Sequence, residues 1–214
     1  MSKKPILDII EREKLIVVAR GVNDYKLVNL FGSLYDGGVR VAEITFGGDD
    51  DQVVATRLRT LISVASKDMC IGAGTVTDLY RARVAYEAGA KFLVSPVFDA
   101  EVSDFCIKKD LLYIAGALTP TEIKRACDGG ADIVKLFPAS SLGSDYLKAV
   151  LAPLKGIPIL AFGGITLQNA ADFLRAGAIG VGVGSAIVDE DMLEMRDYPG
   201  LIEKAYDFVN AIKE

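Results

Sequence analysis

Short apolar segments alternate with amphipathic segments along almost the whole chain. The apolar segments have strand length and are bounded by turn residues, which is typical of strands buried on both faces. Strands are expected at residues 15–20, 40–46, 69–76, 91–95, 111–117, 133–139, 158–162 and 179–183. Helices are expected at 6–13, 25–35, 52–65, 78–87, 100–109, 120–127, 144–154, 168–175 and 201–212. This alternation predicts an α/β fold, a (β/α)8 barrel of the TIM type with an extra N-terminal helix.

A short glycine-containing pattern recurs where a helix ends and a strand begins. It occupies residues 36–39, 87–90, 128–131 and 175–178, with glycine in the third place each time. Glycine suits the left-handed residue that closes a helix. The pattern precedes the second, fourth, sixth and eighth expected strands, as a repeated two-βα unit would. No linker or low-complexity segment interrupts it, so residues 1–214 are expected to form a single barrel domain.

Composition narrows the classes of partner. The net charge is −5 with both signs interspersed, and the absence of a basic stripe predicts no nucleic-acid binding. No apolar run approaches about 18 residues and the N-terminus has no signal-like apolar region, so no membrane association is expected. The three cysteines are odd in number and widely spaced, which indicates reduced, buried side chains in a cytoplasmic protein.

The chain contains no histidine. This excludes Ser-His-Asp and Cys-His catalysis as well as histidine-ligated zinc, so acid–base chemistry falls to Glu, Asp, Lys, Tyr or water. A run of three acids, Asp49 to Asp51, has two interpretations. It is either a metal site or, as we prefer, the capped start of a helix.

The sixth expected strand contains a lysine, Lys135, between apolar neighbours. Lysine is almost never fully buried without a partner. Desolvation lowers the pKa of a lysine, and the neutral amine is a nucleophile, so Lys135 is a candidate for Schiff-base formation with a carbonyl substrate. The alternative is a strand-end lysine whose ammonium reaches water.

Alternation along the strands places further polar residues beside Lys135. In such a barrel the active site lies at the C-terminal ends of the strands, and an inward Lys135 is compatible with inward Glu43, Thr75 and Arg20. An iminium on the lysine acts as an electron sink while a C–C bond breaks, and Glu43 is the candidate proton carrier. Alternatively, Glu43 forms a structural ion pair with Lys135 or Arg20.

Glycines mark the seventh and eighth strand ends. Gly163 and Gly164 follow the seventh strand, and Gly182 and Gly184 fall at the end of the eighth. Loops seven and eight of such barrels often bind phosphate through backbone N–H groups, so an anion site is predicted there. Close strand–helix packing is the alternative explanation. Glycines at the end of the third strand, including Gly74, either admit a ligand or relieve crowding in the barrel.

Six motifs together resemble one family, the class I 2-keto-3-deoxy-6-phosphogluconate (KDPG) and 4-hydroxy-2-oxoglutarate (KHG) aldolases. They are VAEITF at 41–46, IGAGTV at 71–76, VSP at 94–96, LTPTE at 118–122, VKLFP at 134–138 and GG at 163–164. The resemblance covers essentially the whole chain. It implies a lyase, usually a homotrimer, that acts on a small 2-keto acid with no metal and no cofactor.

The resemblance also implies roles for individual residues. Lys135 falls on the family's Schiff-base lysine and Glu43 on its acid–base glutamate. Thr75 matches a threonine near the pyruvate carboxylate, and Arg20 matches an arginine that pairs with a carboxylate or phosphate. The remaining matches are Pro96 and Phe137, which wall the pyruvyl group, and Gly163, Gly164, Gly184 and Ser185, which bind phosphate.

Three positions depart from the family pattern. Gly47 stands where many members have an arginine that contacts the carboxylate, Phe162 where they have a polar residue, and Ala115 where proline is common. The expected reaction is cleavage of KDPG to pyruvate and glyceraldehyde 3-phosphate, with cleavage of 4-hydroxy-2-oxoglutarate to pyruvate and glyoxylate as the alternative. Two further alternatives are a phosphosugar isomerase or decarboxylase, and a non-catalytic barrel that binds a phosphorylated metabolite.

Overall fold

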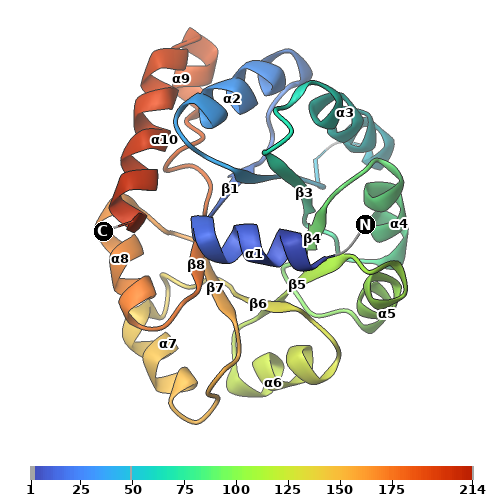
Figure 1. Ribbon diagram of the computed structural model, residues 1–214, viewed down its shortest axis with the longest axis vertical. Helices are drawn as coiled ribbons and strands as arrows, with labels where there is room; N and C mark the ends of the chain where they lie inside the picture. Colours follow the sequence, from blue (N-terminus) through green and yellow to red (C-terminus); the bar gives the residue numbers. More distant parts are fainter. Residues whose placement is uncertain (1–2, 49, 214) are drawn as a thin grey trace.

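The computed structural model describes residues 3–48 and 50–213, and their strands close into a parallel barrel (Figure 1). The strands are β1 (Leu15–Ala19), β2 (Val41–Thr45), β3 (Cys70–Gly74), β4 (Phe92–Val94), β5 (Leu112–Ala117), β6 (Ile133–Leu136), β7 (Ile159–Phe162) and β8 (Gly180–Val183). Each strand pairs with its neighbours in chain order, and β1 pairs with β8. The predicted eight-stranded barrel is therefore confirmed.

Helices surround the barrel in Figure 1. They are α1 (Lys4–Glu13), α2 (Asp24–Asp36), α3 (Asp51–Val64), α4 (Leu79–Glu87), α5 (Ala100–Lys109), α6 (Pro120–Asp128), α7 (Gly143–Leu151), α8 (Leu167–Arg175), α9 (Glu190–Met195) and α10 (Tyr198–Lys213). The predicted leading helix is confirmed, but α9 was not predicted. None of the described helices combines the length and the apolar character needed to cross a bilayer.

Helix α1 lies across the N-terminal end of the barrel, in front of the strands in Figure 1. Its side chain Ile10 is fully buried and packs with the interior residues Ile16 and Val41. Because α1 covers this end with apolar groups, the C-terminal ends of the strands are left to carry polar chemistry.

The recurring glycine pattern has the predicted backbone conformation. Its third residue has positive φ at all four places, namely 92° at Gly38, 97° at Gly89, 94° at Gly130 and 108° at Gly177. These residues precede β2, β4, β6 and β8. The repeated helix ending is therefore confirmed, because glycine adopts this region without the steric cost of a side chain.

The interior of the barrel is packed with side chains from alternate strand positions. Two phenylalanines fill space that a glycine on an adjacent strand leaves open: Phe92 lies against Gly72 and Phe162 lies against Gly182. A methyl group added at either glycine would overlap the facing ring. Both rings are 2% exposed or less. Each ring therefore occupies space that is available only because the facing residue is glycine.

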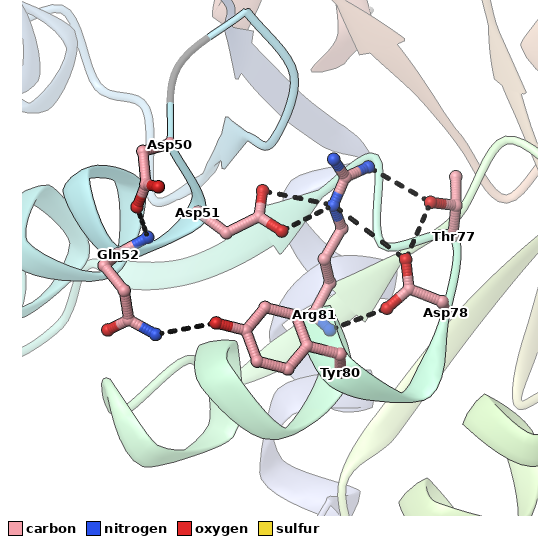
Figure 2. Close-up of polar contacts among 7 residues, drawn as sticks. All are labelled: Asp50, Asp51, Gln52, Thr77, Asp78, Tyr80 and Arg81. Carbon is pink, nitrogen blue, oxygen red and sulfur yellow. Dashed lines mark hydrogen bonds and ion pairs between the residues drawn. The ribbon is translucent and has the colours of Figure 1, made fainter.

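Capping explains the acidic run before α3. Asp50 Oδ1 accepts a hydrogen bond from the Gln52 backbone N–H at 2.8 Å, which satisfies one free donor of the first helical turn. Asp51 accepts from Arg81 Nε at 3.1 and 3.2 Å. Figure 2 shows this cluster, which joins the start of α3 to α4. The capping interpretation is confirmed for Asp50, while Asp49 lies outside the described residues.

Candidate active site

Lys135 and Glu43 are both buried within the barrel, with 5% and 1% of their surfaces exposed. Lys135 lies on β6 and Glu43 on β2, strands that stand opposite one another in the closed order. Alternation of side chains places both among the inward-facing residues. The sequence prediction that these two charged residues point into an apolar interior is therefore met by the structure.

Burial changes the proton affinity of both groups. Desolvation lowers the pKa of Lys135; the charge of Glu43 opposes this effect and that of Arg20 adds to it. Desolvation raises the pKa of Glu43 to about 7, against the opposing effects of Lys135 and Arg20. Each shift favours the neutral form. A neutral amine is a nucleophile, and a carboxyl group that titrates near neutral pH both gives and takes protons.

Aromatic rings surround the lysine amine. Lys135 Nζ lies 5.0 Å from the centroid of the Phe137 ring and 4.6 Å from that of the Phe162 ring. Phe137 also lines, with Pro96, a hollow of about 320 Å³ at the C-terminal ends of β4, β5 and β6. The predicted residues Phe137 and Pro96 are thus brought together near the lysine strand.

Two threonines lie near the candidate site, and only one of them, Thr75, was predicted from the sequence. Thr75 has φ of 58°, which is unusual for a β-branched residue and ends β3 one residue before it. This explains why β3 is shorter than the predicted strand 69–76. Thr45 is not among the predicted site residues, yet it is buried and its Oγ1 has no hydrogen-bond partner among the described residues. The sequence could have indicated Thr45, because it is two residues from Glu43 on the same strand and its side chain therefore points to the same side.

Glu43 also has an unsatisfied atom. No described residue forms a hydrogen bond with its buried oxygen Oε2. Buried polar groups in native proteins are nearly always paired. The orphan oxygens of Glu43 and Thr45 therefore mark a place where a water molecule or a polar group of a substrate fits.

The glycine loops lie at the rim of this interior. Gly163 and Gly164 have φ of 91° and 70°, and Gly164 and Ser185 are exposed. In the described part of the chain, the backbone N–H groups of Gly163, Gly164 and Ser185 donate to no other backbone group. Free amides at the ends of β7 and β8 are suited to binding an anion.

Arg20 lies just beyond β1 and is exposed. Its charge acts on both Glu43 and Lys135. The guanidinium is therefore close enough to the buried pair to act on both charges, although the side chain predicted to face inward is exposed. Gly184 follows β8, and the atoms nearest to a Cβ built on it belong to Val18 of β1, the strand that pairs with β8.

Comparison with known proteins agrees with this arrangement. A family model described as "KDPG and KHG aldolase" matches residues 6–204. The chain is 32% identical to a 2-dehydro-3-deoxy-phosphogluconate aldolase from Treponema pallidum over 90% of each chain. It is 29% identical both to a KHG/KDPG aldolase of Escherichia coli (85% of this chain, 84% of that protein) and to a 2-dehydro-3-deoxy-6-phosphogalactonate aldolase of the same organism (80% and 82%).

A solved structure with related chemistry has a closely similar fold. KDPG aldolase from Legionella pneumophila, with pyruvate captured as a covalent carbinolamine intermediate, superposes with a TM-score of 0.85 at 26% identity, covering 92% of this chain and 95% of that one. A carbinolamine is the adduct expected from an amine and a ketone. The chain belongs to the KDPG and KHG aldolase family and is an aldolase, a lyase.

Proposed function

We propose that this aldolase reversibly cleaves KDPG to pyruvate and glyceraldehyde 3-phosphate through a Schiff base on Lys135. The observation that carries the proposal is the burial of both Lys135 and Glu43, whose charges act on one another, in an otherwise apolar barrel. A pure binding protein gains nothing from a desolvated amine beside a carboxyl group of raised pKa. The relatives named for KDPG cleavage support the same substrate.

The two side chains account for each proton in the reaction. The neutral amine of Lys135 attacks the C2 ketone, and the proton that the nitrogen loses passes to the C2 oxygen, which gives the carbinolamine. Protonated Glu43 then gives its proton to the departing hydroxyl, so that water leaves and the iminium forms. Glu43 then takes the proton of the C4 hydroxyl, the C3–C4 bond breaks, and its electrons move to the iminium, releasing the aldehyde and leaving an enamine. Glu43 gives the proton that it took from the C4 hydroxyl to C3 of the enamine, and hydrolysis of the resulting iminium releases pyruvate and restores the amine.

The rim of the barrel supports a phosphorylated substrate. The free N–H groups of Gly163, Gly164 and Ser185 offer hydrogen bonds, and Arg20 adds positive charge at the same end. Phe162 is buried against Gly182 below these loops, so its bulk does not cover the amides. We infer that the phosphate of KDPG binds there and that Thr75, Pro96 and Phe137 contact the pyruvyl end.

A second substrate, 4-hydroxy-2-oxoglutarate, is favoured by one specific observation. The ring of Phe162 lies 4.6 Å from Lys135 Nζ, and a bulky residue so near the amine favours a shorter substrate. Measuring kcat/KM for both substrates decides between them. A Gly164→Ala change would set a methyl group in a residue with φ of 70°, against Ser140, and is expected to raise KM for KDPG more than for 4-hydroxy-2-oxoglutarate.

The primary test is intact mass after incubation with pyruvate and borohydride. We expect a gain of one reduced pyruvate, mapped to Lys135 by peptide digestion, and no gain in Lys135→Ala. Lys148→Ala, which changes an exposed lysine of α7, serves as the control. A folded wild-type protein that gains no mass, with a known aldolase trapped in parallel, would refute the Schiff-base mechanism.

We also propose that the chain is a single domain that assembles as a homotrimer in the cytoplasm, as expected of this family. Light scattering after size exclusion measures the mass of the assembly. A mass three times 22.9 kDa supports the trimer, and any other multiple refutes it.

A further inference from the structure

We propose that Phe162 is a positioning residue for the reactive lysine: its ring face holds Lys135 Nζ and stabilises the cationic states of that nitrogen. This inference rests on the proposed Schiff-base function. Lys135 Nζ forms no hydrogen bond or ion pair with any residue in the described ranges 3–48 and 50–213. Its close partners are instead the faces of Phe162 at 4.6 Å and Phe137 at 5.0 Å.

These distances fall within the range of cation–π contacts, which extends to about 6 Å from the ring centroid. Such contacts strengthen when the cation is desolvated. Lys135 is 5% exposed and Phe162 is 2% exposed, so little water competes with the ring for the charge. Phe137 is more exposed and stands at the mouth, which leaves Phe162 as the inner face of the pair.

The position of the Phe162 ring is fixed by the strand beside it. Phe162 pairs in register with Gly182, and a Cβ on Gly182 would overlap the ring. The ring therefore fills a slot that exists because residue 182 has no side chain. A side chain held this way keeps its face toward the amine without a hydrogen bond to fix it.

The reaction needs two charge states of the same nitrogen, neutral at one step and cationic at another. Burial keeps the amine neutral for attack, yet the iminium that follows is a cation in the same apolar interior. A ring face stabilises the iminium and not the neutral amine. Loss of the ring is therefore expected to destabilise the iminium relative to the free enzyme, in addition to any loss of packing.

The chain supplies a matched control in Phe92. That ring is also buried and also fills the slot left by a glycine, Gly72, on the adjacent strand. Unlike Phe162, it has no lysine or arginine over its face among the described residues. Phe162→Leu and Phe92→Leu thus remove the same packing, but only the first removes a contact with the reactive nitrogen.

The test measures the pyruvate concentration at which borohydride traps half of the protein. We expect Phe162→Leu to raise this concentration about 3- to 30-fold, the range set by a cation–π contact of intermediate to high strength. Phe92→Leu is expected to change it less than about twofold. Circular dichroism confirms that each variant is folded, and Phe162→Met provides a second variant if leucine does not fold. Equal shifts in the two leucine variants, or none in either, would overturn the proposal.

A second readout does not depend on aldolase activity. Competitive labelling of the unliganded protein with acetic anhydride across pH reports the pKa of Lys135 by peptide mass. Phe162→Leu is expected to lower that pKa, and Phe92→Leu to leave it unchanged. If wild-type protein traps no pyruvate, the proposed function fails, and the labelling result alone decides whether Phe162 stabilises the charged lysine. An unchanged pKa in Phe162→Leu counts against it.

Discussion

Gly74 leaves open the space that the Glu43 carboxyl group occupies: a Cβ built on Gly74 would lie 2.5 Å from Glu43 Oε1. The two residues are on neighbouring strands and face the barrel interior together. The Glu43 side chain is 1% exposed, so it is enclosed by the barrel interior beside Gly74. Of the two explanations for the glycine at the end of β3, the structure supports relief of crowding, because the Glu43 side chain lies beside it.

Gly74→Ala is expected to displace Glu43. Overpacking of this kind costs about 1–3 kcal/mol of stability, and movement of the proton carrier by a fraction of its contact distance is expected to lower kcat about 10- to 100-fold. Urea denaturation and steady-state kinetics measure the two effects. Gly32→Ala, a helical position with nothing within 4 Å of an added Cβ, is the control. Full activity in Gly74→Ala would contradict this account.

The free energy of unfolding is expected to depend on pH because of the raised pKa of Glu43. Its folded pKa is raised to about 7 from 4.5, so the folded state binds a proton that the unfolded state has lost in this interval. Wild-type stability relative to Glu43→Gln should therefore fall as pH rises from about 4.5 to about 7, by roughly 3 kcal/mol at most. Urea denaturation at several pH values measures this difference.

Glu122→Gln provides a control of opposite sign. Hydrogen bonds from Thr119 and Leu118 lower the pKa of Glu122, so its contribution is present above the unfolded pKa and is lost as pH falls. The difference between wild type and Glu122→Gln should thus grow with rising pH. A difference between wild type and Glu43→Gln that is independent of pH would show that Glu43 titrates normally.

Replacing the reactive lysine is expected to stabilise the protein. Burial lowers the pKa of Lys135, which means that its charge is costly in the folded state. At pH 6, where Glu43 is largely protonated, we expect Lys135→Met to raise the free energy of unfolding by about 1–3 kcal/mol while abolishing pyruvate trapping.

The gain in Lys135→Met should shrink at pH 9. There the wild-type lysine loses charge more readily, and the variant leaves an ionised Glu43 without its counter-charge. Lys148→Met, at an exposed site on α7, is expected to stay within about 0.5 kcal/mol of wild type at both pH values. A destabilised Lys135→Met at pH 6 would contradict the cost assigned to the buried charge.

Arg81 contacts residues from both of the segments that follow β2 and β3. Its guanidinium contacts Asp51 at 3.1 Å and Thr77 at 3.1 Å (Figure 2). It also lies 5.7 Å from the centroid of the Phe46 ring. A double-mutant cycle of Arg81→Ala and Asp51→Asn is expected to give a coupling of about 1 kcal/mol in urea denaturation. The exposed pair Lys124 and Asp128 should give no more than about 0.5 kcal/mol. Equal couplings would show that Arg81 has no special structural role.

The order and type of the strands could be predicted because local patterns encode them. Strand alternation and the repeated helix-ending glycines are properties of neighbouring residues, and both are confirmed. Helix α9 was missed because its six residues are too short for a periodic pattern to be distinguished from a loop. The early end of β3 depends on the φ of Thr75, which a β-branched residue rarely adopts and which no pattern around it indicates.

The candidate site was only partly predictable for a similar reason. Lys135 and Glu43 are conspicuous in the sequence because they are charges within apolar strands. Phe162 was noted as a bulky departure from the family pattern, but its ring reaches the lysine because Gly182, twenty residues later, leaves room for it. Such long-range complementarity becomes visible when the strands are paired in space.

The fit of Phe162 into the slot beside Gly182 also constrains how this enzyme can diverge. Any side chain at residue 182 collides with the ring, so that position is closed to change while Phe162 is present. The reverse order is open, because a smaller residue at 162 leaves a void that a later side chain at 182 can fill. Mutational routes toward a different interior must therefore pass through residue 162 first, and libraries that vary 182 alone will return inactive or unfolded proteins.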